Sequence, residues 1–369
     1  MASNPVVVYG ASGYTGALTC EFLTQFGVPF TAAGRDRARL SAVMQKLPGV
    51  ETAQYDIAEV AHEVDALAKV FSGAKVVCNV VGPFSSLGDI VVEAALKAGC
   101  HYIDTTGEQA HVILAREEFG AAYAKRGLLL APSTAYMHAV LEIAARACIS
   151  HGEVDTLEGV CAPTGTPTFA STQTIFQSVR AKEFYLEGGA LKPWPAAHAA
   201  EVSVPFTDRT LLALPWSGTA VPIWFQDDPR IRNVKVMTAF SDRNLMTQVH
   251  GIYQHYHANL AKLPEDQQQA ELAKIAASIQ PGMPPRENPL FHRNWDSVIG
   301  TSSLGRVRYT IYSHCPYQQT GLLQAFAANW LLKAPPRAPG FQSPCAAFGA
   351  DNLLGALERF GYARMAKEA

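Results

Sequence analysis

Several patterns that define other classes of protein are missing from this chain of 369 residues. Its seven cysteines are scattered and form no C-x-x-C pair, which disfavours a disulfide framework or a structural zinc and favours reduced thiols. The formal net charge of −2 provides no basic excess for nucleic acid or an anionic membrane. No apolar run is long enough to cross a bilayer, and no basic and apolar leader precedes Pro5. We therefore expect a soluble, cytoplasmic protein.

Motifs of several enzyme classes are also absent. The chain has no G-x-S-x-G, no H-E-x-x-H and no G-x-x-x-x-G-K-[ST], so no nucleophile elbow, metalloprotease helix or P-loop is indicated. His250, His255 and His257 are the residues that most resemble a set of metal ligands. On a helix, His255 would not share the face of the other two. We predict no metal site.

The chain is organised around a stretch close to its amino terminus. Val6–Tyr9 is a β-branched and aromatic run, typical of a strand buried on both faces of a parallel sheet. Gly10, Gly13 and Gly16 follow at intervals of three, and an amphipathic helical pattern begins at Thr15. A strand, a glycine turn and a helix in this order suit the diphosphate of a dinucleotide, which free N–H groups and the helix dipole attract. The predicted contacts are Gly10, Ser12, Gly13, Tyr14, Thr15 and Gly16.

The end of the second predicted strand indicates which dinucleotide binds. This strand, residues 29–33, ends about twenty residues after the glycines, where the adenosine ribose is expected. Arg35 stands there with Arg37 and Arg39 close by, and a guanidinium pairs well with a 2′-phosphate. We therefore favour NADP(H) over NAD(H), although Asp36 weakens the preference. A solvated helix start is the alternative role for the arginines.

Three later positions are predicted to contact the rest of the cofactor. Asp56, just past the third predicted strand, is assigned either to the adenine amino group or to the N-cap of a helix. The fourth predicted strand, residues 75–81, leads into a loop where we expect the nicotinamide ribose, or else a tight structural turn. The residues of this loop are Val81, Gly82, Pro83 and Phe84. Gly107, after the fifth strand, is the last predicted contact.

Six strands with intervening helices occupy residues 1–150. This alternation predicts the α/β class, with a Rossmann-type doubly wound parallel sheet.

Four short blocks of this part resemble the saccharopine dehydrogenase-like oxidoreductases. They are YGASGYTG at the first turn, AAGRDRARL after the second strand, NVVGPF after the fourth and YIDTTGE after the fifth. The group includes saccharopine reductases and the trans-acting enoyl reductases of lipid and polyketide assembly. The resemblance implies an NADP(H)-dependent oxidoreductase that reduces a C=C or C=N bond of a small or carrier-bound metabolite.

The resemblance also implies how the remaining residues are organised. Residues 151–334 should form an α+β domain for the substrate and for a homodimer interface, and residues 335–369 should return to the first domain. Aromatic residues are frequent in the second domain and suit either an apolar or acyl substrate or an ordinary core. They are Phe169, Phe176, Phe184, Tyr185, Trp194, Trp216, Trp224 and Phe225.

The arginines of that domain separate the two subgroups. A saccharopine-type substrate carries several carboxylates and calls for clustered arginines, whereas the arginines here are dispersed. The enoyl reductases are therefore the better guide. A saccharopine-type amino-acid dehydrogenase remains the rival enzyme, and a non-catalytic protein that senses NADP(H) or binds a partner remains the rival of another class.

Tyr102, Asp104 and His138 are the predicted catalytic residues. Tyr102 and Asp104 alternate onto one face of the fifth predicted strand, residues 101–104, and His138 stands at the start of the helix after the sixth. A hydride from nicotinamide must be matched by a proton, which a phenol, a carboxyl or an imidazole can supply. Glu108 and Tyr136 lie in the same region of the predicted topology. Structural roles stay open: a loop cap for Asp104 and a hydrogen-bonding role for His138.

Overall fold

The computed structural model describes residues 4–165, 167–169, 171–172, 178–205, 207–215, 219–277 and 284–368. The chain divides into two compact units. The first comprises Met1–Thr106, His111–Ile143 and Pro316–Arg364, and the second comprises Gly107–Ala110, Ala144–Cys315 and Met365–Ala369.

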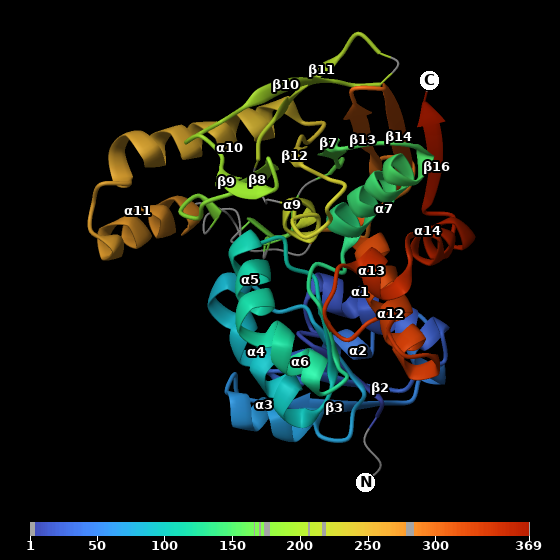
Figure 1. Cartoon of the computed structure of the whole chain (residues 1–369). Coiled ribbons are helices and arrows are strands. Elements are labelled where there is room, and N and C mark those ends of the chain that lie inside the picture. Colours follow the sequence, from blue (N-terminus) through green and yellow to red (C-terminus); the bar gives the residue numbers. More distant parts are fainter. Residues whose placement is uncertain are drawn as a thin grey trace. The chain divides into compact units, whose positions relative to one another are not determined.

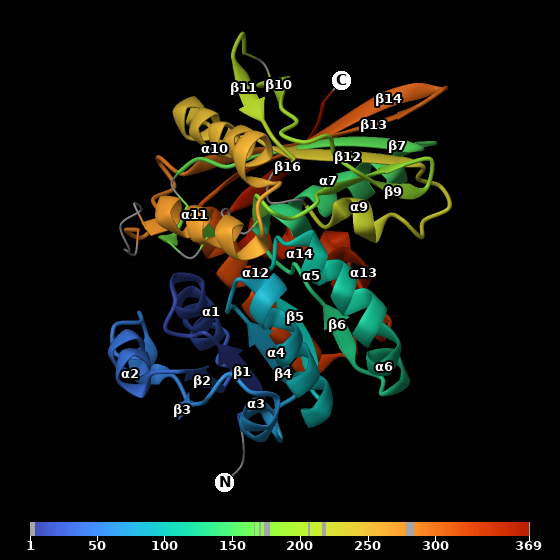
Figure 2. The same ribbon diagram turned by 90° about the vertical axis from the view of Figure 1, so that its left-hand side faces the viewer.

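The first unit is built on a parallel sheet of seven strands, in the order β15-β6-β5-β4-β1-β2-β3 (Figures 1 and 2). Without β15 this is the order 3-2-1-4-5-6 of dinucleotide-binding sheets, so the predicted α/β class and Rossmann-type sheet are confirmed. The strands are β1 (Val6–Tyr9), β2 (Phe30–Gly34), β3 (Tyr55–Glu59), β4 (Val76–Asn79), β5 (His101–Asp104), β6 (Leu129–Ala131) and β15 (Gly340–Phe341).

Helices cover both faces of this sheet (Figure 2). Val7, Val77 and Tyr102 belong to one apolar cluster with side chains of α3, α4 and α6. The next residue along β4, Cys78, points to the opposite face, where it lies close enough to Cys20 of α1 to help raise the pKa of that thiol beyond the effect of burial. The helices are α1 (Tyr14–Gln25), α2 (Arg37–Met44), α3 (Val64–Phe71), α4 (Phe84–Ala98), α6 (Gly120–Lys125), α12 (Pro316–Lys333), α13 (Pro344–Phe348) and α14 (Ala350–Arg359).

The chain returns to the first unit earlier than the sequence predicts. Helix α12 was expected in the second domain, but it packs on α1 so closely that a Cβ at Gly321 would lie 2.8 Å from Leu18 Cβ. The return therefore begins at Pro316 and not at residue 335. Farther along, Glu142 of α7 (Tyr136–His151) accepts hydrogen bonds from Ser343 Oγ at 2.5 Å and from the Cys345 N–H at 2.9 Å. These bonds hold the amino-terminal end of α13.

The second unit contains a mixed sheet of seven strands in the order β16-β14-β13-β7-β12-β8-β9 and a separate hairpin of β10 and β11. Its strands are β7 (Thr156–Ala162), β8 (Phe184–Glu187), β9 (Ala190–Pro193), β10 (Ala200–Ser203), β11 (Thr210–Ala213), β12 (Asn233–Thr238), β13 (Arg293–Ser302), β14 (Gly305–His314) and β16 (Ala363–Glu368). Its described helices are α9 (Val221–Trp224), α10 (Arg243–His255) with a π turn at Tyr256–Leu260, and α11 (Glu265–Ala277). Helix α5 (Gln109–Leu114) and α7 each contribute residues to both units.

Mild acid is expected to weaken the first unit through His101. The His101 Nδ1 accepts a hydrogen bond from the Leu129 N–H at 2.9 Å, and burial lowers the pKa of this ring to about 4. An unfolded histidine titrates near 6.5, so the stability that the neutral ring provides is complete above about pH 6.5 and is lost as the pH falls towards 4. Thermal melts between about pH 7 and pH 4 should show a smaller loss for His101→Gln, which keeps an acceptor, than for the wild type. Parallel losses in the two proteins would contradict this role.

Candidate functional site

The turn between β1 and α1 has no room for side chains at two of its glycines. Gly10 has a φ of 94°, in the region that favours glycine, and its carbonyl accepts a hydrogen bond from the Gly13 N–H at 2.9 Å. A Cβ at Gly16 would lie 2.3 Å from Gly10 O and 2.8 Å from Ala11 Cα, so the start of α1 touches the turn directly. The structure thus places Gly10, Ser12 and Gly13 in one tight turn and Tyr14, Thr15 and Gly16 in the first turn of α1.

The amino end of α1 faces this turn with its own backbone donors. The N-cap residue, Gly13, gives the helix no side-chain hydrogen bond. The first N–H groups of a helix have no partner inside it, and an anion satisfies them best. Ser12, Gly13, Tyr14 and Thr15 are all partly exposed. The turn therefore fits the diphosphate of a dinucleotide.

The loop after β4 lies directly against the glycine turn. A Cβ at Gly10 would come within 2.7 Å of Val81 Cγ2, and the Val81 N–H donates to Asn79 Oδ1 at 3.0 Å. Pro83 is the N-cap residue of α4, which starts at Phe84. The structure therefore places the predicted ribose loop, Val81 to Phe84, beside the predicted diphosphate turn. Gly107 is the third residue after Asp104, the last residue of β5, and it is counted with the second unit.

Arg35 differs from the two neighbouring arginines in its contacts. The Arg37 guanidinium donates to Ile57 O at 3.0 Å, and Asp36 caps α2 by accepting from the Arg39 N–H at 2.9 Å. The exposed Arg35 has no hydrogen-bond partner in the part of the chain that the structure describes. Its charge reaches Tyr9 at the end of β1, where it opposes the rise in the pKa of the phenol that burial causes. Arg35 thus lies at the carboxyl edge of the sheet with its guanidinium available.

The structure corrects the position of Asp56. This residue does not follow the third strand, because it is the second residue of β3. In a parallel sheet the start of a strand lies at the edge opposite the ligand edge. The Asp56 carboxylate accepts from Asn4 Nδ2 at 3.1 Å there, so its predicted placement at the adenine is wrong, and it is no N-cap either.

Asp104 is fully buried at the end of β5, and its carboxylate is surrounded by donors. Its Oδ1 accepts from the N–H groups of Thr106 at 2.9 Å and Ser133 at 2.8 Å. Its Oδ2 accepts from the Tyr102 hydroxyl at 2.9 Å and lies 3.1 Å from His111 Nε2. Asp104 therefore caps its loop, as one of the two predicted roles requires. The N–H groups that it accepts from are those of Thr106 and Ser133.

The network continues through side chains that the sequence did not single out. Asn79 Nδ2 donates to the Tyr102 oxygen at 3.0 Å, which links the ends of β4 and β5. The His111 ring occupies space left by Gly88 of α4, where a Cβ would lie 2.3 Å from His111 Cε1. Gln324 Nε2 of α12 donates to Asp104 O at 2.8 Å. No local pattern marks Gln324, because its partner Asp104 lies 220 residues away, whereas His111 stands only seven residues after Asp104.

His138 is almost completely buried, with 2% of its surface exposed. Burial lowers the pKa of its ring to about 4 against the opposing charge of Asp104, so the imidazole is neutral at neutral pH. Its Nδ1 has no hydrogen-bond partner among the described residues, and the same holds for Ser133 Oγ and Gln324 Oε1. Three polar atoms without partners therefore gather around the Asp104 network, where native interiors normally leave few.

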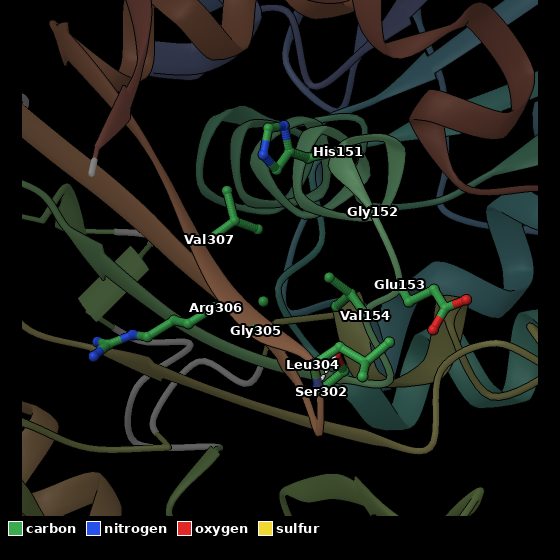
Figure 3. A pocket seen from close by; sticks show the side chains of 10 residues that line it. His151, Gly152, Glu153, Val154, Ser302, Leu304, Gly305, Arg306 and Val307 are labelled. Atoms are coloured by element: carbon green, nitrogen blue, oxygen red, sulfur yellow. Dashed lines mark hydrogen bonds between the residues drawn. The ribbon is translucent and has the colours of Figure 1, made fainter.

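The described part of the second unit contains hollows that lie within this unit. One of about 300 Å³ lies beside the β13–β14 hairpin, and Figure 3 shows Glu153 and Arg306 extending from it in opposite directions. The other, of about 240 Å³, is lined in part by Glu183, Trp194 and Tyr253. Among the other aromatic residues predicted to line a substrate site or the core, Trp224 and Phe225 are buried. Phe176 and Trp216 lie outside the described residues.

Comparison with known proteins gives two family matches. Residues 6–152 match the family described as "Saccharopine dehydrogenase NADP binding domain". Residues 139–366 match the family described as "Family of unknown function (DUF5938)". Within the described residues, no helix is long and apolar enough to cross a membrane, and no group of three His, Cys, Asp or Glu side chains could hold a metal ion.

Individual relatives match only part of the chain. "Lipid droplet localized protein" of Caenorhabditis elegans is 34% identical over 35% of this chain and 32% of its own length. "Trans-acting enoyl reductase" of Mycobacterium ulcerans (strain Agy99) is 35% identical over 28% and 25%. "Saccharopine dehydrogenase-like oxidoreductase" of Homo sapiens is 28% identical over 36% and 34%. The chain thus spans a third or less of the length of the first of these relatives.

The sheet order, the glycine turn and the match over residues 6–152 together define a unit of the dinucleotide-binding type, and they confirm the resemblance to saccharopine dehydrogenase-like oxidoreductases. The match over residues 139–366 covers more than half of the sequence. The chain belongs to the family of unknown function DUF5938.

Proposed function

We propose that the protein is an NADP(H)-dependent oxidoreductase that reduces a C=C (enoyl) or C=N bond of a small or carrier-bound metabolite. The observation that carries the proposal is the glycine turn, where a Cβ at Gly16 would lie 2.3 Å from Gly10 O and α1 begins at a glycine N-cap that gives no side-chain hydrogen bond. The relatives named enoyl reductase and saccharopine dehydrogenase-like oxidoreductase support the class of reaction. When bound, the reduced nicotinamide would supply the hydride.

The residues that would hold the cofactor follow from their positions. The diphosphate would bind the turn from Gly10 to Gly16, the 2′-phosphate would pair with Arg35, and the nicotinamide ribose would lie along Val81 to Phe84. Gly107 remains a proposed contact on the nicotinamide side. The three partnerless polar atoms, His138 Nδ1, Ser133 Oγ and Gln324 Oε1, suit a group with both donors and acceptors, such as the nicotinamide carboxamide or a substrate carbonyl.

We propose different roles for the three predicted catalytic residues. Both oxygens of Asp104 are already taken by protein donors, so Asp104 and Tyr102 would position the ends of β4 and β5. His138 keeps one ring nitrogen without a partner, so it is our proposed proton donor. A neutral imidazole can donate its N–H to a carbonyl that gains negative charge during reduction.

The saccharopine-type alternative finds less support in the second unit. Arg180, Arg230 and Arg243 each pair with a carboxylate of their own, namely Glu265, Asp228 and Glu201. These arginines are therefore not gathered to bind a substrate with several carboxylates. A homodimer and a cytoplasmic location remain parts of the proposal. The location is supported by seven buried cysteines, none of which forms a disulfide.

Substitution of Arg35 should separate the two cofactors. A guanidinium–phosphate contact contributes about 1.5–3 kcal/mol, so Arg35→Gln should weaken NADPH binding about 10- to 100-fold and leave NADH binding unchanged. Arg39→Gln is the matched control, because that side chain is equally exposed and lies four residues on. Fluorescence titrations with both nucleotides provide the measurement. Equal weakening of NADPH binding in the two variants would show that Arg35 does not bind the 2′-phosphate.

Turnover separates a catalyst from a nucleotide sensor. We expect the wild type to oxidise NADPH with a short enoyl thioester, or with a pre-formed imine if the C=N reaction is the correct one. His138→Gln should abolish this oxidation and keep NADPH affinity within about twofold, whereas Tyr102→Phe should lower thermal stability as well as rate. Cofactor binding without oxidation by either substrate would favour the sensing alternative.

A further inference from the structure

We propose that the hollow lined by Glu183, Trp194 and Tyr253 in the second unit binds a small organic ammonium ion. The hollow lies wholly within that unit, and the proposal does not depend on the cofactor site. Its volume of about 240 Å³ is slightly below the usual range for small-molecule sites, which limits the occupant to a small molecule.

The walls of the hollow combine one acidic side chain with flat aromatic surfaces. The indole of Trp194 stacks on His198 with ring centroids 4.9 Å apart, and the Tyr185 ring packs against the same indole with centroids 4.7 Å apart. Helix α10 contributes Tyr253 and His250. The His250 ring is held in place by a hydrogen bond between its Nε2 and Ala197 O, at 3.0 Å. Aromatic faces attract cations through their quadrupoles, and indole does so most strongly.

Two polar groups in this wall are buried without partners. Glu183 is 8% exposed, and its Oε2 has no hydrogen-bond partner among the described residues. The Tyr253 hydroxyl is likewise buried and without a partner in that part of the chain. The two groups are close enough that the Glu183 charge helps to raise the pKa of the Tyr253 phenol, after the larger effect of burial. An ammonium group has three N–H donors, and the two oxygens can each accept one of these hydrogen bonds.

The charges around Glu183 favour a cation over an anion. Burial raises the pKa of Glu183 to about 8, and the negative charge of Glu108 adds to the rise. Among the residues that the structure describes, no positive side chain counteracts this rise. The other titratable groups that line the hollow are the exposed Lys182 and His257, the fixed His250 and the stacked His198. An ammonium ion would supply the counter-charge that Glu183 lacks, whereas an anion would meet two carboxyl groups.

The binding step has a defined proton balance. At neutral pH the Glu183 carboxyl is protonated, and the amine binds as its ammonium form. Formation of the ion pair therefore requires that the carboxyl proton leaves for the solvent. Close to one proton should be released for each amine bound near pH 7, and fewer as the pH approaches the pKa of the carboxyl at about 8.

Calorimetric titration of the full chain with benzylammonium chloride, in two buffers of different ionisation enthalpy, tests the proposal. Benzyl alcohol is the neutral counterpart of the same shape. We expect the amine to bind with release of about one proton near pH 7 and the alcohol to bind at least tenfold more weakly. Glu183→Gln should weaken binding of the amine at least tenfold, and Tyr253→Phe should weaken this binding about threefold. Glu153→Gln changes the exposed glutamate beside the hollow in Figure 3 and should leave the affinity for the amine unchanged.

Three results would overturn the proposal: no binding of the amine to the wild type, equal affinity for the alcohol, or unchanged amine affinity in folded Glu183→Gln. Thermal melts establish folding, and Glu183→Gln should be at least as stable as the wild type near pH 8, because it removes a buried carboxyl that must ionise there without a partner. Titration of the same samples with NADPH measures separately whether the first unit still binds its proposed cofactor. A loss of amine binding alone would therefore leave the proposed oxidoreductase function intact.

Discussion

Gly16→Ala is expected to weaken NADPH binding at least 100-fold, which is the largest effect on binding that the structure predicts. The new Cβ would lie 2.3 Å from Gly10 O and 2.9 Å from Gly10 C. Both atoms belong to the backbone, so no side chain can turn aside. The start of α1 would have to move away from the turn, which would displace the N–H groups proposed to hold the diphosphate.

Gly251→Ala provides the matched control for this substitution. Gly251 lies inside α10, and a Cβ there meets nothing within 4 Å. Alanine favours a helix over glycine by about 0.5–1 kcal/mol, so this variant should be slightly more stable and should bind NADPH as the wild type does. Tight NADPH binding by folded Gly16→Ala would show that the diphosphate does not depend on the turn.

Asp104→Ala is expected to lower the free energy of unfolding of the first unit by about 3–5 kcal/mol, the largest loss of stability among our predictions. The substitution leaves the N–H groups of Thr106 and Ser133, the Tyr102 hydroxyl and the His111 ring without their acceptor. For a unit of this size the melting temperature should fall by about 10 °C or more.

Two further variants make this test specific. Asp104→Asn keeps the oxygen that accepts from the two N–H groups and exchanges the other for a donor, so its loss should be intermediate. Asp65→Ala removes an exposed carboxylate whose only described ion pair is with Lys97, and its melting temperature should match the wild type. A similar, small effect from all three variants would show that the Asp104 network adds little to stability.

The structural features around the proposed site that the sequence predicted correctly are those fixed by local pattern. The bounds of β5, His101–Asp104, are those expected, because four buried residues between a glycine and a polar loop allow little latitude. The glycine turn was recognisable for the same reason: the spacing of Gly10, Gly13 and Gly16 directly reports where backbone touches backbone. Tyr102 and Asp104 share a face because side chains alternate along a strand.

The parts that failed depend on distant contacts or weak patterns. The edge strand β3 contains no fully buried residue, so its sequence gave no firm position for Asp56. Helix α12 belongs to the first unit because Gly321 fits against Leu18, about three hundred residues earlier in the chain, and Gln324 reaches Asp104. Neither contact leaves a local sign in the sequence. The roles of Tyr102, Asp104 and His138 in a reaction remain proposals that kinetics must test.

Titration of the purified protein with NADPH and with NADH, followed by nicotinamide fluorescence, tests the central claim most directly. We expect one site for each nucleotide per chain, with tighter binding of NADPH, and loss of both in Gly16→Ala. If neither nucleotide binds to the folded protein, the first unit is not a dinucleotide site and the proposed function is wrong.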